Sequence, residues 1–395
     1  QSEARRGACA AWLPLEHKDI LDFLDIGTEG NPIQNLQYGI TVTDKWIQEM
    51  KDGDSEKRII WAKVIQRRNE FGFPYIMFKD NSNNNSPYKE LGLDITASNL
   101  CSEIQLPTDS FNSFVCCLGS LNLLHWEEIE QTDAVETYTL FLNAVIDEFI
   151  TKSKTMPGMS RAYNFAKDHR AIGLGVMGWH SLLQSKLVEF ESMEAKYLNS
   201  HIFNIIKIRS DDASQELCKT KDVSCIREGF ANTTLMAIAP TKSSSFIHGA
   251  VSMGIEPIKS NYFIKDLAKS KTVYKNPFLE CELDKYNLNT EEVWEDILKR
   301  DGSVQHLDFP TKEVFKSFIE ISPKEIIIQA ATRQKYIDQS QSLNLMIHPT
   351  VPAKDINQLY LFAHEQGVKT LYYQFSISSA QSFSRNILEC DSCGA

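Results

Sequence analysis

The amino-acid sequence predicts an α/β fold with largely parallel strands, and three observations lead to this prediction. Short apolar runs such as Tyr75-Ile76-Met77-Phe78 alternate along the chain with longer segments of helical periodicity. The composition, 42% hydrophobic and 24% charged, is ordinary for a globular protein. No apolar run reaches the roughly 20 residues that a membrane-spanning helix needs. Strands that alternate with helices are typical of parallel sheets covered by helices.

Length, charge and cysteine content narrow the class of protein. By length alone, a chain of 395 residues suggests about two to three domains. The net charge of -11 argues against nucleic acid or an anionic membrane as a partner. Nine scattered cysteines differ from the dense pairs of a secreted disulfide scaffold, and residues 1–6 contain no signal-peptide core. We therefore expect a soluble, cytoplasmic protein with reduced thiols. Because the chain has no initiating Met, we expect it to begin inside a larger domain.

The first third of the chain is expected to start with a short strand that Pro14 closes. We then expect helices at residues 17–24, 43–50 and 55–71, the last of them ended by Gly72. A buried strand should follow at residues 74–80. The polar tract at residues 81–87 is interpreted as a solvated loop.

The rest of the chain continues the alternation. We expect strands at residues 114–123, 233–239, 343–347 and 369–375. We expect helices at residues 134–150, 199–218, 324–336 and 354–365, the last capped by Gly367. The clearest apolar stripe belongs to the helix at 134–150 and comprises Val135, Leu140, Leu142, Val145, Ile146 and Ile150.

One short stretch combines three side chains suited to chemistry. If the segment around Cys101 is extended, Asn99, Cys101 and Glu103 share one face, because side chains alternate along a strand. In a functional interpretation a thiol attacks a substrate that an amide orients and a carboxylate deprotonates. In the alternative, the segment is a loop with a solvated amide and carboxylate and a buried cysteine. Spacing alone favours the loop.

Two other segments invite a nucleotide-binding interpretation. Residues 240–245 follow an expected strand and combine hydroxyl side chains with Lys242, a pattern that suits an anion, although a plain helix cap also uses such residues. Gly173-Leu174-Gly175-Val176-Met177-Gly178 matches the dinucleotide fingerprint by letter. The residues before it do not form a buried strand, so we interpret its glycines as a means for a helix to pack closely on a neighbour.

The C-terminal part contains a tyrosine pair and a dithiol. In a regular strand Tyr372 and Tyr373 would point to opposite faces, so the backbone must be irregular if the two rings act together. Cys390 and Cys393 form a Cys-x-x-Cys in the tail. No second pair exists to complete a zinc site, which favours thiol–disulfide exchange over metal binding.

Jointly, these motifs resemble the large catalytic subunit of class I ribonucleotide reductase. The resemblance rests on Asn99-Leu100-Cys101-x-Glu103, Leu371-Tyr372-Tyr373-Gln374, residues 240–244 with Gly254-Ile255-Glu256-Pro257 after them, and the terminal Cys-x-x-Cys. It covers almost the whole chain but about the C-terminal half of the family's subunit. Arg6, Gly7 and Ala8 look like the end of its substrate-specificity loop, which suggests a subunit split as in an interrupted phage-type gene.

The resemblance implies a fold and a reaction. Residues 1–380 would form the C-terminal part of a ten-stranded α/β barrel with a central finger loop and without its N-terminal strands, and residues 381–395 a flexible redox tail. The chain would be part of a ribonucleoside-diphosphate reductase that makes deoxyribonucleoside diphosphates for DNA synthesis by thiyl-radical chemistry. It would be inactive alone.

Residue roles follow from the matching positions. Cys101 matches the cysteine whose thiyl radical removes the 3′ hydrogen, Glu103 the base for the 3′-hydroxyl proton, and Asn99 the amide that holds the ribose hydroxyls. Cys116 matches the cysteine that protonates the leaving 2′-hydroxyl and ends in a disulfide with a cysteine of the missing half. Because Cys117 is its direct neighbour, it stays open whether Cys116 and Cys117 share this role.

The remaining roles concern the radical, the phosphate and the reductant. Tyr372 and Tyr373 match the end of the radical relay, and Cys390 and Cys393 the pair that reduces the active-site disulfide. The substrate phosphate clamp corresponds to Pro240, Thr241, Lys242, Ser243 and Ser244, where the lysine departs from an acidic residue found in some members. Four cysteines are left as structural: Cys9, Cys218, Cys225 and Cys281.

The implied partners lie outside this chain. The resemblance implies no cofactor or metal bound by the chain itself, a metal-dependent radical cofactor in a small radical-generating subunit, and thioredoxin or glutaredoxin as reductant. Nucleoside triphosphate effectors would bind through the missing half, which belongs to a complementary N-terminal large-subunit chain. Ribonucleoside diphosphates would be the substrates, in the cytoplasm or in the host cytoplasm if phage-encoded.

Two alternatives remain open at this point. One is a glycyl-radical or cobalamin-dependent ribonucleotide reductase, which would not need a tyrosine relay. The other is a non-enzymatic fragment that binds a phosphorylated partner or serves in assembly.

Overall fold

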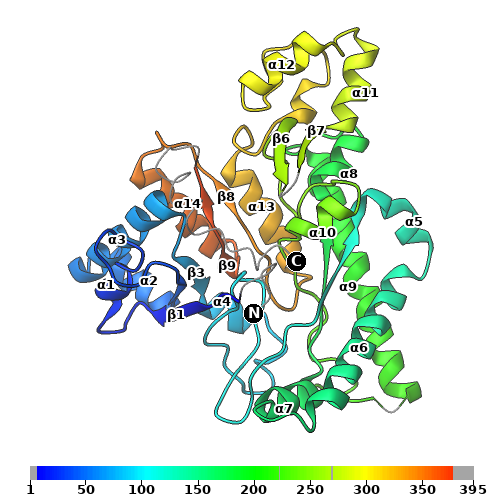
Figure 1. Ribbon diagram of the computed structural model, residues 1–395. Coiled ribbons are helices and arrows are strands. Elements are labelled where there is room, and N and C mark those ends of the chain that lie inside the picture. Colours follow the sequence, from blue (N-terminus) through cyan, green and yellow to red (C-terminus); the bar gives the residue numbers. More distant parts are fainter. Residues whose placement is uncertain (1–6, 222, 268–269, 377–395) are drawn as a thin grey trace.

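The computed structural model describes residues 7–221, 223–267 and 270–376, in which helices surround several small sheets (Figure 1). The largest sheet has the strand order β1-β2-β3-β9, formed by β1 (Ala10–Pro14), β2 (Gln37–Val42), β3 (Tyr75–Phe78) and β9 (Thr370–Leu371). The first three strands are parallel and β9 is antiparallel to β3. The prediction of an α/β fold with largely parallel strands is thereby confirmed.

The other sheets are pairs of strands. Two of them are parallel, β4 (Leu118–Asn122) with β5 (Gly173–Met177) and β8 (Leu345–Met346) with β10 (Gln374–Phe375). The third is the antiparallel hairpin of β6 (Tyr262–Leu267) and β7 (Ser270–Lys275). The strand expected at 233–239 is a buried extended segment held by single parallel bridges, from Met236 to Leu174 and from Ile238 to Gln341.

Helices cover these sheets, and each of the seven helices expected from the sequence overlaps one of them. Their bounds are α1 (Ile20–Phe23), α2 (Asp44–Asp52), α3 (Ser55–Phe71), α4 (Lys79–Asn84), α5 (Trp126–Gln131), α6 (Ala134–Ser153), α7 (Ser160–His169), α8 (Trp179–Ser185), α9 (Met193–Lys221), α10 (Lys242–Ile247), α11 (Pro277–Lys285), α12 (Glu291–Lys299), α13 (Pro323–Gln334) and α14 (Ala353–Glu365), with 3-10 turns η1 (Leu123–His125) and η2 (Lys312–Phe315). Within the described ranges, no helix is both long and apolar enough to cross a membrane.

Strand β2 was not expected from the sequence, although all six of its residues are buried. It contains Gly39, a residue that usually weakens a strand. Here the missing side chain makes room for a neighbour, because a Cβ atom on Gly39 would lie 2.5 Å from the ring of Trp12 on β1. A close contact between neighbouring strands therefore explains the glycine.

The polar tract at residues 81–87 is not the solvated loop that composition suggested. Its first half belongs to α4, and its asparagines hold other segments in place. Asn81 Nδ2 donates hydrogen bonds to the carbonyl oxygens of His364 and Val368. Asn83 bonds to both the N–H and the C=O of Ile95. Local composition could not reveal these partners, because they come from distant parts of the chain.

The stripe expected on α6 is only partly buried. Val135, Leu142 and Ile146 lie in the core, whereas Leu140 and Val145 are 44% and 40% exposed. The three buried residues are spaced by seven and four positions, as one helix face requires, and the two exposed residues project from other sides. The expectation for Leu140 and Val145 was therefore wrong.

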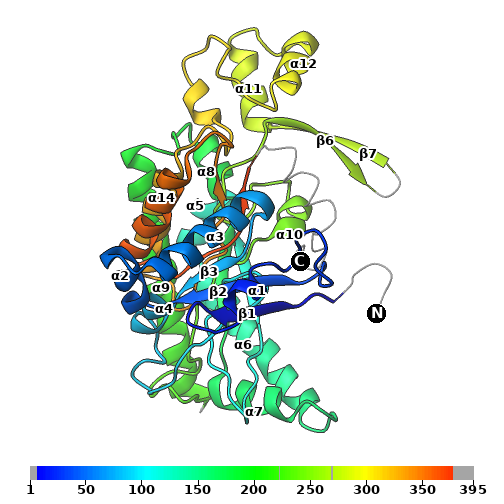
Figure 2. The same cartoon turned by 90° about the vertical axis from the view of Figure 1, so that its left-hand side faces the viewer.

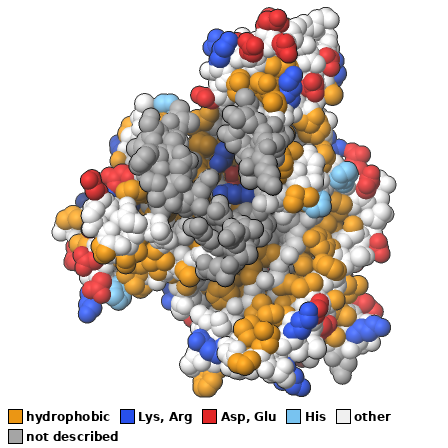
Figure 3. All heavy atoms as spheres, viewed as in Figure 1, with side chains coloured by type: hydrophobic (Ala, Val, Ile, Leu, Met, Phe, Trp, Pro, Cys, Tyr) orange, Lys and Arg blue, Asp and Glu red, His pale blue; other side chains and the backbone are white. Residues whose placement is uncertain are grey.

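Residues 276–315 form a lobe at the top of the molecule, with the β6–β7 hairpin next to it (Figures 1 and 2). No element was expected there from the sequence. The lobe has its own hydrophobic cluster, separate from the main core: Leu279, Leu283, Trp294, Ile297, Val304, Phe309, Val314 and Phe315. On the face of the lobe that Figure 3 shows, charged side chains of both signs lie among polar and hydrophobic ones.

Candidate active site

The candidate site is built on the finger segment, Ser98–Leu106, which does not form the extended strand considered above. The chain turns at its tip, where the Ser102 N–H donates to the Asn99 carbonyl oxygen over 3.4 Å. Ser102 has a φ of 67°, a left-handed conformation that non-glycine residues seldom adopt. The Asn99 side chain also accepts a hydrogen bond from the Ile104 N–H at 3.2 Å. A turn, rather than strand alternation, therefore sets the directions of the three polar side chains.

A polar run, Asp338–Ser342, lies against the finger segment and holds its backbone. The Ser342 hydroxyl donates to the Cys101 carbonyl oxygen at 2.7 Å, and the Ser340 N–H donates to the Glu103 carbonyl oxygen at 2.9 Å. The Thr370 hydroxyl, at the start of β9, donates to the Ser102 carbonyl oxygen at 2.9 Å. Buried backbone groups need such partners, so these hydroxyls fix the residues around the thiol.

The Glu103 carboxylate lies inside this arrangement and is 1% exposed. Burial raises its pKa from 4.5 to about 7, because a charged carboxylate loses its hydration in the protein interior. Hydrogen bonds from the side chains of Asn99 and Ser342 oppose part of this rise; the Ser342 hydroxyl is 3.3 Å from Oε2. A carboxyl group with a pKa near the working pH is well placed to accept and release a proton.

Cys116 and Cys117 differ in their surroundings. Cys116 is an exposed residue whose thiol is nonetheless partly desolvated by neighbouring protein atoms. This desolvation and then the nearby Glu103 carboxylate raise the pKa of the Cys116 thiol well above its usual range. Cys117 is buried and points the other way, with its sulfur 3.6 Å from the Leu142 carbonyl oxygen on α6. The geometry therefore distinguishes the two neighbours.

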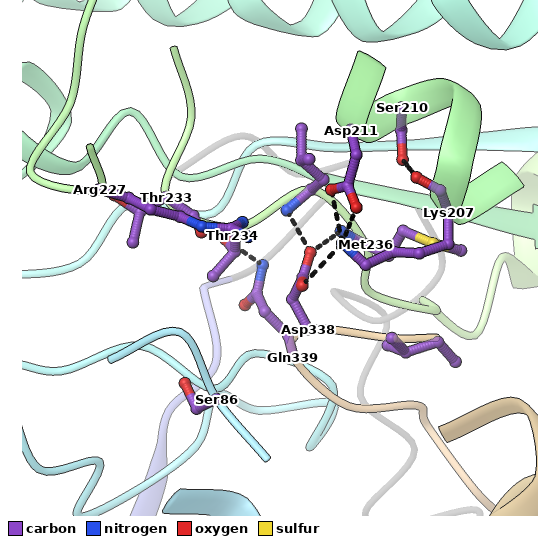
Figure 4. Close-up of polar contacts among 12 residues, drawn as sticks. Ser86, Lys207, Ser210, Asp211, Arg227, Thr233, Thr234, Met236, Asp338 and Gln339 are labelled. Atoms are coloured by element: carbon purple, nitrogen blue, oxygen red, sulfur yellow. Dashed lines mark hydrogen bonds and ion pairs between the residues drawn. The ribbon is translucent and has the colours of Figure 1, made fainter. Parts of the chain in front are cut away.

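A charge cluster of Asp338, Lys207 and Asp211, of which only Asp338 is buried, anchors the polar run (Figure 4). The Asp338 carboxylate accepts hydrogen bonds from the N–H groups of Leu235 and Met236 at 2.8 and 3.2 Å. Lys207 of α9 lies 3.4 Å from the same carboxylate and also pairs with Asp211. These contacts join the polar run to the extended segment 233–239.

Lys369, next to Thr370, extends this anchor. Its buried ammonium group donates to the carbonyl oxygens of Asp338 at 2.6 Å and Asn85 at 2.8 Å. Burial lowers the pKa of Lys369 to about 7, and the Asp338 carboxylate opposes this change. The polar run is thus held by the extended segment 233–239 and by Lys369.

Tyr372 and Tyr373 lie in a break between two short strands, since β9 ends at Leu371 and β10 begins at Gln374. Their ring centroids are 4.4 Å apart, with an interplanar angle of 55°. Tyr75 of β3 packs against both rings, at centroid distances of 4.8 and 5.1 Å. The backbone irregularity that a joint role would require is therefore present.

The phosphate loop, Pro240–Ser244, leads into the short helix α10 as expected. Thr241 has a φ of 50°, and its hydroxyl accepts a hydrogen bond from the Gly254 N–H at 2.8 Å. This bond joins the loop to the Gly254–Pro257 motif. Lys242 is half-buried and Ser243 is exposed, so both have side chains within reach of solvent. The first N–H groups of a helix have no partner inside the helix and can donate hydrogen bonds to an anion.

Contrary to the inference from the sequence, Gly173 and Gly175 do not pack a helix on its neighbour. They belong to the buried strand β5, and Gly178 precedes helix α8. A Cβ on Gly175 would lie 2.5 Å from the Ala237 carbonyl oxygen, and one on Gly173 would lie 2.8 Å from the Ala237 Cβ. The glycines therefore allow the extended segment 233–239 to approach β5. As predicted, helix α7, not a strand, precedes them.

The expected specificity-loop residues and tail cysteines are not part of the arrangement described above. Gly7 and Ala8 are exposed at the start of the described chain, whereas Arg6, Cys390 and Cys393 lie outside the described residues. In the described ranges, no group of three or more His, Cys, Asp or Glu side chains is arranged to hold a metal ion.

Three residues that hold the finger segment were not expected from the sequence: Gln339, Ser342 and Thr370. A signal was available: Asp338-Gln339-Ser340-Gln341-Ser342 is a run of polar residues without Gly or Pro, directly before an apolar strand. A loop of that composition usually contains turn residues. All five side chains are buried, so the run faces the protein interior.

Comparison with known proteins gives a consistent result. The family model described as "Ribonucleotide reductase, barrel domain" matches residues 1–57, 55–226 and 222–374. The ribonucleoside-diphosphate reductase large subunit of Invertebrate iridescent virus 3 is 33% identical over 460 residues, covering 94% of this chain and 72% of the relative. The large subunit of Danio rerio is 29% identical, covering 93% of this chain and 56% of the relative.

A solved structure is also similar. It is the alpha subunit of the Actinobacillus ureae class Id ribonucleotide reductase, which is 51% identical to this chain with a TM-score of 0.89. The match covers 96% of this chain and 72% of that one. The shares spanned in the viral relative and in the solved structure exceed the half that the sequence analysis expected.

Proposed function

The chain belongs to the family of class I ribonucleotide reductase large subunits, and on that premise we propose which of its residues carry out the reaction. The resemblance inferred from the sequence is confirmed, as is the α/β barrel fold of that family. The described strands are joined by short ladders and single bridges rather than by one closed sheet. The assignments that follow concern the chemistry of individual side chains.

We propose that Cys101, as a thiyl radical, takes the 3′ hydrogen atom of a ribonucleoside diphosphate. The S–H bond forms as the C3′–H bond breaks and leaves a carbon radical. Glu103 accepts the 3′-hydroxyl proton, and Asn99 orients the ribose hydroxyls. The observation that supports this most is the Ser342 hydroxyl, which contacts both the Cys101 carbonyl oxygen and the Glu103 carboxylate and so keeps thiol and base together.

We assign the reductant role to Cys116 and not to Cys117. Cys116 would protonate the leaving 2′-hydroxyl, which departs as water, and would form a disulfide with a cysteine of the complementary part of the large subunit. The exposure of Cys116 and its electrostatic contact with Glu103 support this choice, whereas the buried Cys117 faces α6. Cys390 and Cys393 would reduce that disulfide by exchange, and thioredoxin or glutaredoxin would reduce them in turn.

Substrate and radical would reach this site from two sides. The phosphate loop, with Lys242 and the N-terminal end of α10, would bind the diphosphate. Tyr373 and Tyr372 would pass the radical inward from a small subunit, whose metal-dependent cofactor supplies the oxidising equivalent. The contact between the two tyrosine rings supports a relay, and with it the class I assignment over a glycyl-radical or cobalamin-dependent enzyme.

Reconstitution tests the proposal. The chain is mixed with the complementary large-subunit part and the small subunit, and deoxyribonucleoside diphosphate formation is measured with a dithiol reductant. Cys101→Ser and Tyr372→Phe should each abolish turnover without changing assembly on a sizing column. Cys281→Ser, at an exposed cysteine in the lobe, serves as the matched control and should retain full activity.

Each contrary outcome has a distinct meaning. Turnover by Cys101→Ser would refute the thiyl assignment, and turnover by Tyr372→Phe would refute the relay. Turnover by the unmixed chain would refute the need for partners. Assembly without any activity of the unaltered chain would favour the non-enzymatic alternative.

A further inference from the structure

The peptide group that joins Tyr372 to Tyr373 is held at both ends by side chains. Arg68 Nη1 of α3 donates to the Tyr372 carbonyl oxygen at 2.9 Å. The Tyr373 N–H donates to Asn344 Oδ1, also at 2.9 Å. The backbone groups on either side of this peptide bond to other backbone groups. The Tyr372 N–H donates to the Leu343 carbonyl oxygen, and the Tyr373 carbonyl oxygen accepts from the Leu345 N–H.

This arrangement bears directly on the geometry of the ring pair. In a regular strand, successive side chains point to opposite faces, so neighbouring tyrosines could not touch. Here the ladder is interrupted at the shared peptide, and the rings lie 4.4 Å apart. We propose that Arg68 and Asn344 are positioning residues for the tyrosine pair: they hold the shared peptide in the irregular conformation that lets the two phenols exchange a radical. This inference rests on the relay role proposed above.

Arg68 is well suited to this task because its guanidinium group is rigid and has several donors. It is fully buried and also donates to the Tyr360 hydroxyl at 2.8 Å and to the Pro74 carbonyl oxygen. Pro74 directly precedes Tyr75, whose ring packs on both relay tyrosines. One side chain therefore fixes the tyrosine peptide relative to the strand that forms the wall of the aromatic cluster.

Asn344 has its orientation set by a second contact. Its Nδ2 group donates to the buried carboxylate of Glu256, in the motif that follows the phosphate loop. An amide has one donor end and one acceptor end, so this bond directs Oδ1 toward the Tyr373 N–H. A flipped amide would place two donors together at the tyrosine and leave the carboxylate facing an acceptor. Glu256 thereby sets the orientation of the Asn344 amide.

The step that depends on this geometry is a balanced exchange. The Tyr373 radical takes one electron and one proton from the Tyr372 phenol, which leaves neutral Tyr373 and a Tyr372 radical. The oxidising equivalent comes from the small subunit, as proposed above. A change in ring separation or ring angle would slow this step without changing how the substrate binds, because neither positioning residue lies in the phosphate loop or the finger segment.

Asn344→Leu is the primary test, since leucine is close in size to asparagine and has no polar atoms. In the reconstituted reductase we expect kcat to fall about 10- to 100-fold, the range typical of small misplacements of reacting groups, with KM for the diphosphate unchanged. Asn199→Leu is the matched control. It removes another fully buried amide with two hydrogen bonds, to Gln329 and Arg333 on α13, and should leave kcat unchanged.

A spectroscopic readout separates positioning from general destabilisation. With 3-aminotyrosine in place of Tyr373, the trapped radical's hyperfine coupling to its side-chain methylene protons reports the ring orientation. We expect Asn344→Leu to change this coupling and Asn199→Leu to leave it as it is. If Asn344→Leu does not fold, Arg68→Lys decides. Lysine keeps the charge, but its donors all lie on one nitrogen and cannot reproduce the separate positions of Arg68 Nε and Nη1, which serve the three acceptors. The same two changes are expected.

The outcomes distinguish this inference from the proposed function. Activity retained in Tyr372→Phe would refute the relay and this inference with it. If Tyr372→Phe is inactive while folded Asn344→Leu, or Arg68→Lys in its place, keeps full kcat and an unchanged radical spectrum, the positioning inference alone is overturned. A loss of kcat equal to that of Asn199→Leu would overturn it as well.

Discussion

Replacing Glu103 by glutamine should make the protein more stable at alkaline pH while it removes turnover. The carboxyl has a pKa of about 7 in the folded protein, against an ordinary value of 4.5. Between these two values the folded state retains a proton that the unfolded state releases, so the stability of the native protein falls as pH rises. The full difference corresponds to about 3 kcal/mol, at about 1.4 kcal/mol for each tenfold change in proton affinity.

Only part of this free-energy difference falls within the pH range of the experiment. From about pH 5.5 to about pH 8.5, the free energy of unfolding of the unaltered chain should drop by about 2 kcal/mol relative to Glu103→Gln, because glutamine does not titrate. Urea unfolding of both proteins at several pH values measures this difference. Glu103→Asp, which retains a carboxyl group, is the control. A difference between the unaltered chain and Glu103→Gln that does not vary with pH would refute the assignment of a raised pKa to this group.

Three further changes test other parts of the structure. Cys116→Ser should lower multiple-turnover activity by at least about 100-fold, as expected when a reacting group is removed, whereas Cys117→Ser should stay within about twofold; equal losses in a turnover assay would contradict our choice between them. Gly175→Ala should lower stability by about 1–3 kcal/mol in thermal unfolding, because the added Cβ would lie 2.5 Å from the Ala237 carbonyl oxygen; an unchanged melting temperature would show that β5 can move. Because Ser102 has a φ of 67°, Ser102→Val should lower the free energy of unfolding by about 1–3 kcal/mol, whereas Ser102→Gly should lower it by less than about 1 kcal/mol. Equal denaturation midpoints for the two variants would argue against strain at the tip of the finger segment.

Local signals in the sequence predicted several elements well. Helix α3 has the bounds expected from its apolar periodicity, and Gly72 ends it with a φ of 88°. Such features depend on neighbouring residues alone, so they can be deduced from the sequence. Similar signals existed in the lobe: Asn276 and Thr290 cap α11 and α12 with their side chains, and Pro277 occupies the first helical position.

The residue types of the candidate site could be singled out from the sequence, whereas their arrangement in space could not. Asn99, Cys101 and Glu103 could be singled out by their chemistry, but the turn at Ser102 depends on hydrogen bonds from distant residues. The candidate phosphate loop could likewise be singled out by its composition, whereas the bond from the Gly254 N–H to the Thr241 hydroxyl could not be foreseen. Backbone partners supplied by remote segments leave no periodic trace in the sequence.

The contacts around the finger segment have a consequence for the order of folding. The partners of Cys101, Ser102 and Gln105 lie 241, 268 and 234 residues further along the chain. Contacts between such distant residues require large loops to close, which makes them slow to form. We expect thiol and carboxylate to come together among the last events of folding, after the helices have docked. An incompletely folded chain would then lack the arrangement of Cys101 and Glu103 on which the proposed reaction depends.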